Sequence, residues 1–173
     1  SFRETPYAFL ANGDPVTQAW VRNQLAADSF VFLDTMNFWI EGSRDALVEA
    51  IRTVDGVVMN DDEARALGGS DNLIAAIGRI TELGVSTLVV KKGEHGSILM
   101  KDGELFALPA YPLASVFDPT GAGDTFASGF MGAVAESGDT SFRGLKRALA
   151  YGTVVASFTV EGFGLERLLA IDR

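Results

Sequence analysis

Apolar segments of two kinds alternate along this chain. Short runs of consecutive apolar residues lie between polar residues or glycines, and longer segments place apolar residues every three to four positions. Short uninterrupted runs are typical of strands buried on both faces, and the longer repeat is typical of helices with one apolar face. The alternation of the two predicts an α/β protein with a mostly parallel sheet.

The pattern also places the individual elements. Buried strands are expected at residues 30–34, 56–59 and 86–90. Helices should begin beside polar side chains that accept hydrogen bonds from the first helical N–H groups. Asp14, Ser43, Asn60, and Ser70 or Asp71 are the expected capping residues. Helices are expected at residues 14–25, 43–54, 70 or 71 to 83, and 141–160. A short helix is expected to begin at residue 60, one after the glycine-rich turn is expected to end at about residue 137, and a last helical segment is expected after residue 164.

The texture changes after Gly93. Residues 96–100 and 104–107 are apolar runs that flank Lys101-Asp102-Gly103. An Asp-Gly pair between two such runs is typical of a β-hairpin, so an antiparallel pair is expected here. The apolar segment 113–117 is expected to form a further strand that leads into a glycine-rich turn.

Composition limits the classes of protein. The chain has 173 residues and 47% hydrophobic content, which predicts a single domain over residues 1–173. The net charge is −9 and no basic cluster occurs, which argues against a nucleic-acid partner. No apolar run is long enough for a bilayer and the start lacks a secretory pattern, so we expect no membrane partner and a cytoplasmic location. The absence of cysteine agrees with that location.

The most informative segment is residues 118–126, Asp-Pro-Thr-Gly-Ala-Gly-Asp-Thr-Phe. Free N–H groups at a helix start attract anions, and Gly121 and Gly123 allow a phosphate to approach the main chain closely. Asp124 would repel that phosphate if its only task were binding. It is better suited to accept the proton of a substrate hydroxyl that attacks a γ-phosphate held by the turn.

Other phosphate-binding motifs do not fit this segment. A Walker A loop needs a lysine, and none lies between Gly103 and Gly144. A dinucleotide fingerprint needs a third glycine where Phe126 stands. A simple turn with Asp124 offsetting the helix dipole would explain a bare Gly-x-Gly-Asp, but the whole string favours a phosphoryl-transfer site.

The string resembles the C-terminal signature of the ribokinase-like (PfkB) carbohydrate kinases. The resemblance implies a three-layer α/β/α fold with a mostly parallel sheet. It implies that Gly121, Ala122 and Gly123 form an anion hole, that Asp124 is the catalytic base, and that Thr120, Gly121 and Gly123 contact ATP. The implied activity is ATP-dependent transfer of the γ-phosphate to a hydroxyl of a sugar or sugar-like alcohol.

Asn60 and Glu63 carry a second motif. Their spacing alone predicts a capping box, with each side chain bonded to the backbone N–H of the other residue. The resemblance adds a role in positioning Mg²⁺ near the ATP phosphates through water, because an Asn-x-x-Glu motif occurs at this place in the family. Both interpretations can hold together, since hard cations prefer oxygen ligands.

Three further positions follow predicted strands. Asp34 and Asn37 resemble the family's Asp-x-Asn segment, which implies a place on the substrate or phosphate side of the cleft, while an Asx turn explains them equally well. Gly93 matches a family loop that contacts the nucleotide. At the position of Lys91 the family often has threonine. A lysine there could either reach the ATP phosphates as a point charge or be solvated at the end of the strand.

Two further residues, His95 and Gly152, lie outside these motifs. His95, the only histidine, has no partner for a metal site and is expected in an exposed loop. Gly152, in the helix expected at 141–160, takes by resemblance a place in the wall of an adenine pocket. Helical core packing is the alternative.

The resemblance covers about residues 34–164, the C-terminal half of a typical member. The N-terminal half and its lid are therefore expected to be missing, with weak or no turnover by the chain alone. An open sheet edge is then expected to favour self-association. The alternatives are a non-catalytic nucleotide-binding or interaction fragment, and a nucleoside or vitamin-precursor kinase with the same signature.

Overall fold

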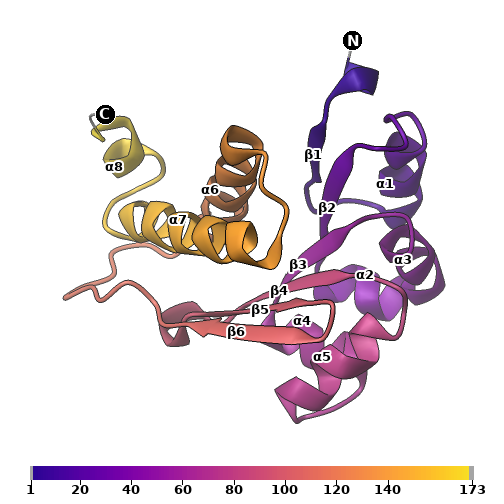
Figure 1. Ribbon diagram of the computed structural model, residues 1–173. Coiled ribbons are helices and arrows are strands. Elements are labelled where there is room, and N and C mark those ends of the chain that lie inside the picture. The colour runs from indigo at the N-terminus through magenta and orange to yellow at the C-terminus, as the bar shows by residue number, and fades with distance from the viewer. Residues whose placement is uncertain (1, 172–173) are drawn as a thin grey trace. The chain divides into compact units, whose positions relative to one another are not determined.

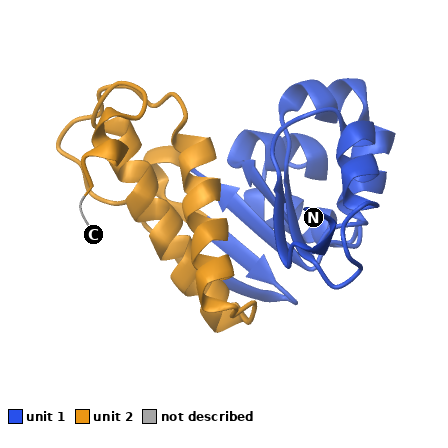
Figure 2. Cartoon of the chain, turned by 90° about the horizontal axis from the view of Figure 1, so that it is seen from above, with its two compact units in different colours: residues 1–92, 98–105 blue, residues 93–97, 106–173 orange. Residues whose placement is uncertain are grey.

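The structure, a computed structural model, describes residues 2–171. Within this range the chain forms two compact units (Figure 2). The first unit runs to residue 92 and includes residues 98–105, and the second comprises residues 93–97 and the chain from 106 onward. No helix in the described range is both long and apolar enough to cross a membrane.

A six-stranded sheet has its strands in sequence order, β1 to β6 (Figure 1). The strands are β1 (Tyr7–Leu10), β2 (Phe30–Asp34), β3 (Gly56–Asn60), β4 (Thr87–Lys91), β5 (Ser97–Lys101) and β6 (Glu104–Leu108). The pairs β1–β2, β2–β3 and β3–β4 are parallel, so their carboxyl ends lie at one edge of the sheet. The strands predicted at residues 30–34, 56–59, 86–90, 96–100 and 104–107 are confirmed, and β1 is an addition.

The turn between β5 and β6 confirms the predicted hairpin. Asp102 has a φ of 49° and Gly103 a φ of 85°. Two consecutive positive φ angles define the type I′ turn, whose twist suits two-residue hairpins and which Asp-Gly sequences favour. The local sequence is therefore sufficient to explain where the sheet becomes antiparallel.

Five helices belong to the first unit, and their caps agree only in part with the sequence. The helices are α1 (Pro15–Arg22), α2 (Asn37–Gly42), α3 (Arg44–Ile51), α4 (Asp61–Gly68) and α5 (Leu73–Thr81), after a short 3₁₀ turn, η1 (Phe2–Glu4). Asp14 accepts from Val16 and Thr17, as predicted. Ser43 makes no capping bond through its side chain, and Asn72 caps α5 instead of Ser70 or Asp71.

The core of the first unit explains the uninterrupted apolar runs. Consecutive strand residues, which point to opposite faces of the sheet, are fully buried in β2, β3 and β4. Their helical partners in the core are Leu47, Ile51, Leu67, Ile77 and Ile80. Each such side chain contributes about 1.5–3 kcal/mol by leaving water, so burial on both faces stabilises the strands that carry the polar edge.

The second unit is mainly helical. It contains a 3₁₀ turn, η2 (Gly93–His95), and the helices α6 (Ala122–Ser137), α7 (Phe142–Val160) and α8 (Glu166–Leu169). Residues 113–117 form no strand, which corrects the prediction, and Phe117 is 73% exposed. An apolar run makes a strand only where it finds a pairing partner and a buried face. The glycine-rich segment leads directly into α6.

We expect opposite effects from alanine at two helical glycines of the first unit. A Cβ at Gly68 would lie 2.6 Å from the backbone of Ala76, so Gly68→Ala should destabilise the protein by about 1–3 kcal/mol through overpacking. A Cβ at Gly78 would meet nothing within 4 Å, so Gly78→Ala should stabilise it by about 0.5–1 kcal/mol. Urea unfolding of both variants measures this, and equal effects would contradict the packing described for α4 and α5.

Candidate functional site

The glycine-rich segment folds into a turn held by its own backbone. Asp118 Oδ1 accepts the N–H of Thr120 at 2.9 Å, which lowers the pKa of the Asp118 carboxyl. The N–H of Ala122 donates to the carbonyl of Pro119 at 3.1 Å. Gly121 has a φ of 80°, which favours glycine whatever space surrounds it. The chain thereby enters α6 at a fixed point.

This geometry distinguishes among the predicted anion-hole donors. The N–H of Ala122 is engaged by Pro119, whereas those of Gly123 and Asp124 find no acceptor among the described residues. Both belong to the first turn of α6, where N–H groups have no partner within the helix. The Asp124 side chain is exposed beside them. Two N–H groups that could donate hydrogen bonds to an anion, and one carboxylate, therefore lie together at the start of α6.

A second group of predicted residues meets at the carboxyl edge of the sheet in the first unit. Asp34 ends β2, Asn60 ends β3 and Lys91 ends β4, with Asn60 and Lys91 paired in register. Lys91 Nζ lies 3.9 Å from Asp34 Oδ2, with only 19% and 7% of the two side chains exposed. This ion pair orients Lys91 toward Asp34, which the sequence did not predict.

The predicted capping box at Asn60 and Glu63 is confirmed. Asn60 Oδ1 accepts the N–H of Glu63 at 2.8 Å, and Glu63 Oε2 accepts the N–H of Asn60 at 2.7 Å. Burial of Glu63 raises the pKa of its carboxyl, against the bond from Asn60 and the nearby ammonium of Lys91, which lower it; Asp34 adds to the rise. Glu63, Lys91 and Asp34 thus form one electrostatic group.

The same group bears on the predicted Mg²⁺. No cluster of three or more His, Cys, Asp or Glu side chains that could hold a metal occurs among the described residues. Asn60 and Glu63 each use an oxygen in the capping box. Such oxygens fit a hydrated Mg²⁺, which keeps several waters, better than a fully protein-bound ion. The residues therefore fit outer-sphere positioning.

The remaining predicted residues lie in separate places. Asn37 is exposed at the start of α2. Gly93 has a φ of 54° at the start of η2, and His95 beside it is exposed, as predicted. Gly152 is buried in α7, where an added Cβ would lie 2.7 Å from the carbonyl of Phe126 on α6. Close helix packing is sufficient to explain this glycine.

Gln18 is a buried residue of the polar edge that the sequence did not point to. Its amide nitrogen lies 2.9 Å from the carbonyl of Asp34, 2.9 Å from that of Ala11 and 3.2 Å from that of Leu10. It therefore holds the carboxyl ends of β1 and β2 together from α1. The only sequence signal was a polar residue on the buried face of a helix.

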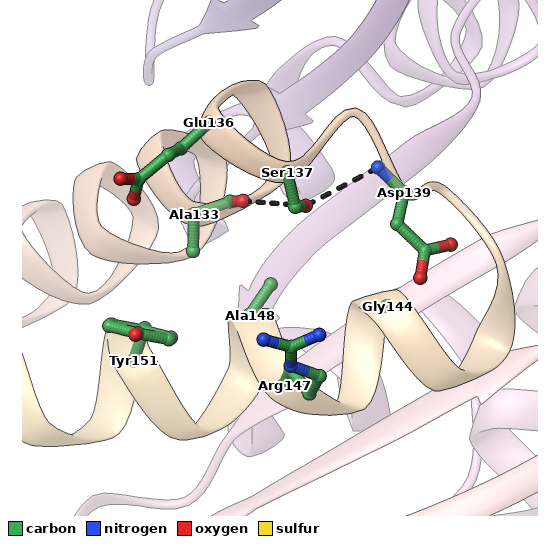
Figure 3. Close-up of a pocket in the computed structure, with 8 residues that line it drawn as sticks. All are labelled: Ala133, Glu136, Ser137, Asp139, Gly144, Arg147, Ala148 and Tyr151. Carbon is green, nitrogen blue, oxygen red and sulfur yellow. Dashed lines mark hydrogen bonds between the residues drawn. The ribbon is translucent and has the colours of Figure 1, made fainter.

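A pocket of about 270 Å³ lies elsewhere in the second unit (Figure 3). The end of α6 and the start of α7 line it, with Ser137 bonded to the carbonyl of Ala133 and to the N–H of Asp139. None of the predicted site residues lines this pocket. The predicted residues other than Asn37, Gly93 and Gly152 form two groups, one at the sheet edge of the first unit and one at the start of α6 in the second.

The chain is similar to known carbohydrate and nucleoside kinases. The model of the pfkB family carbohydrate kinases matches residues 19–170. A nucleoside kinase from Methanocaldococcus jannaschii is 29% identical over 94% of the chain and 51% of its own length. A fructoselysine 6-kinase from Shigella flexneri is 30% identical over 93% of the chain and 59% of its own length. The chain spans about half the length of the curated relatives it matches.

Solved structures support the same fold. The crystal structure of the M. jannaschii nucleoside kinase has a TM-score of 0.78 and 28% identity, over 92% of this chain and 51% of its own. That of a ribokinase from Thermotoga maritima has a TM-score of 0.78 and 25% identity, over 94% and 52%. The predicted α/β fold class with a mostly parallel sheet is confirmed, and it is the ribokinase-like fold of these structures. The chain belongs to the PfkB family of carbohydrate kinases.

The raised pKa of Glu63 predicts a pH dependence of stability. The unfolded chain loses this proton near the ordinary pKa of 4.5, while the folded protein keeps it to higher pH. The stability that Glu63 contributes is therefore present below that value and lost as the pH rises through the folded pKa. Glu63→Gln keeps an acceptor for Asn60 but removes the titration. The free energy of unfolding of the wild type, minus that of the variant, should fall as the pH rises above about 4.5.

Urea unfolding at several pH values from about 4 to about 7 measures this difference. Glu94→Gln is the control, because 88% of the Glu94 side chain is exposed. If the free energy of unfolding of the wild type minus that of Glu63→Gln rose with pH, Asn60 and Lys91 would lower the pKa of Glu63 by more than burial raises it.

Proposed function

We propose that the protein is an ATP-dependent phosphotransferase that transfers the γ-phosphate to a hydroxyl of a sugar or sugar-like substrate. The observation that carries the proposal is the start of α6. There, the N–H groups of Gly123 and Asp124 have no acceptor among the described residues, and the Asp124 carboxylate is exposed beside them. A phosphoryl group needs such donors and its attacking hydroxyl needs such a base.

In this proposal the turn Gly121-Ala122-Gly123 stabilises the negative charge that develops on the transferred phosphoryl group. The donors are preorganised because the backbone of the turn is already bonded to itself. Asp124 accepts the proton of the substrate hydroxyl. Thr120 and Gly93 are assigned to the nucleotide side, with Gly152 as a weaker assignment because packing explains it.

The edge of the sheet supplies the remaining roles. Asn60 and Glu63 would position Mg²⁺ through its waters, and the ion, when bound, neutralises charge on the phosphates. Asp34 and Asn37 are assigned to the substrate. Lys91 serves first to pair with Asp34 at 3.9 Å, and its ammonium adds positive charge near the ATP phosphates.

The acceptor is proposed as a class. Relatives include a cytidine kinase from Thermococcus kodakarensis and a fructokinase from Klebsiella pneumoniae, so nucleosides and simple sugars are both candidates. A second candidate function is nucleotide binding without transfer. This second candidate is considered because the chain matches only about half the length of its relatives. The resemblance to the family implies that the lid and most sugar contacts belong to the N-terminal half of a typical member.

Asp124→Asn separates the two functions. Its amide cannot accept the proton, so phosphoryl transfer should fall at least about 100-fold while Mg·ATP affinity changes little. Calorimetry with Mg·ATP, followed by transfer assays with sugars and nucleosides, measures both. Glu136→Gln, at the far end of the same helix, is the control and should leave both unchanged.

Each outcome of that experiment is informative. Transfer that persists in Asp124→Asn would remove the base assignment. ATP binding by the wild type without transfer to any acceptor would favour the nucleotide-binding candidate. Absence of Mg·ATP binding would contradict both.

We also propose that copies of the chain associate through the edge of the sheet at β1. Within the described sheet, β1 pairs with β2 alone, which leaves one side of the strand open. Open edges pair with other chains unless charges protect them. Sedimentation should show species larger than a monomer at about 100 µM, and Phe9→Lys should reduce them by placing a charge on the edge. A clean monomer at that concentration would contradict the association.

A further inference from the structure

The last turn of α7 reaches the glycine turn through two hydroxyl groups. Thr159 Oγ1 lies 3.0 Å from Thr125 Oγ1, which lies 2.9 Å from the carbonyl oxygen of Gly121. Each hydroxyl has one proton to donate, and a carbonyl oxygen only accepts. Thr125 must therefore spend its proton on Gly121, and Thr159 must be the donor to Thr125. The chain of bonds has one direction, from α7 to the turn.

The contrast with a neighbouring threonine shows that this bond is unusual for its helix. Thr153, also on α7, donates to the carbonyl of Leu149 four residues earlier, which is a common bond for a helical threonine. Thr159 is 3% exposed and directs its hydroxyl out of its own helix. The hydroxyl of Thr159 thus bonds to α6, and through Thr125 to the turn, instead of to its own helix.

The bond from Thr125 fixes the peptide that precedes α6. The carbonyl of Gly121 accepts both the N–H and the hydroxyl of Thr125, each at 2.9 Å. A trans peptide is planar, so fixing this carbonyl also fixes the opposed N–H of Ala122, which donates to Pro119. The N–H groups of Gly123 and Asp124 belong to the next two peptides, in the first turn of α6.

The same turn of α7 also holds the chain before the glycines. The carbonyl of Val160 accepts the N–H of Phe117 at 2.7 Å and that of Asp118 at 3.4 Å. The glycine turn is therefore tethered on both sides to two consecutive residues of one helix.

We infer that Thr159 is a positioning residue for the phosphoryl-binding turn. It acts through Thr125 on the Gly121 peptide. The ligand of the turn rests on the proposed function, whereas the geometry that Thr159 maintains is testable without a ligand.

The test compares two substitutions at one position. Thr159→Val keeps the shape of the side chain and removes the donor, and Thr159→Ser keeps the donor. Without ligand, amide hydrogen exchange of Ala122 should be roughly 2- to 10-fold faster in Thr159→Val, the range that loss of one net hydrogen bond gives. It should return to the wild-type rate in Thr159→Ser. Thr153→Val, which loses a hydroxyl bond within the same helix, should leave Ala122 unchanged.

A second measurement connects this geometry to the ligand. Mg·ATP affinity should fall by a similar factor, roughly 2- to 10-fold, in Thr159→Val and recover in Thr159→Ser. An unchanged exchange rate at Ala122 would overturn the inference, and so would an equal acceleration at all amides of α6 and α7. A wild type that binds no Mg·ATP, with Ala122 still responding to Thr159→Val, would contradict the proposed function and support the positioning role.

Discussion

The N–H groups at the start of each helix need acceptors outside the helix, and this constraint organises the polar chemistry of the chain. Asn60, Asn72 and Ser141 supply side-chain acceptors for α4, α5 and α7. Among the helices of nine residues or more in the described range, α6 differs, because it begins at Gly121 without a side-chain cap. The N–H groups of Gly123 and Asp124 in its first turn have no acceptor among the described residues, and the proposed function rests on that observation.

The carboxyl edge of the sheet contains buried ionisable side chains, which also need partners. Two carboxyl groups, Asp34 and Glu63, are buried there, and burial disfavours their charged forms. Lys91 offsets part of that cost beside Asp34, and the backbone of Asn60 offsets part of it at Glu63. These contacts offset only part of the cost, because the pKa of Glu63 remains raised. The ammonium of Lys91 would also repel a bare cation, which supports the proposal that Mg²⁺ is positioned through its waters.

Features set by local chemistry could be predicted from the sequence. The Asp102-Gly103 hairpin and the Asn60–Glu63 capping box each depend on residues within one turn, and both are confirmed. The cap of α5 was misplaced because several consecutive residues there can accept a hydrogen bond, and only the final path of the chain selects Asn72. The apolar run 113–117 failed as a strand because pairing, which the sequence does not show, decides that outcome.

Features that depend on register or helix packing could not be read from the sequence. The pairing of Lys91 with Asp34 requires strands separated by more than fifty positions to end at one edge. Gln18 became relevant only when α1 placed its amide beside three carbonyls.

Gly152 shows how packing and function are connected in the second unit. Its missing side chain lets α7 approach the carbonyl of Phe126, and a Cβ at Gly129 of α6 would lie 3.1 Å from the Cα of Gly152. Phe126 directly follows Thr125, the residue that fixes the Gly121 peptide. A glycine that admits close helix contact at this point keeps Thr159 within hydrogen-bond distance of Thr125. Gly152 therefore affects the position of the glycine turn through the spacing of two helices, an effect that requires no contact with a nucleotide.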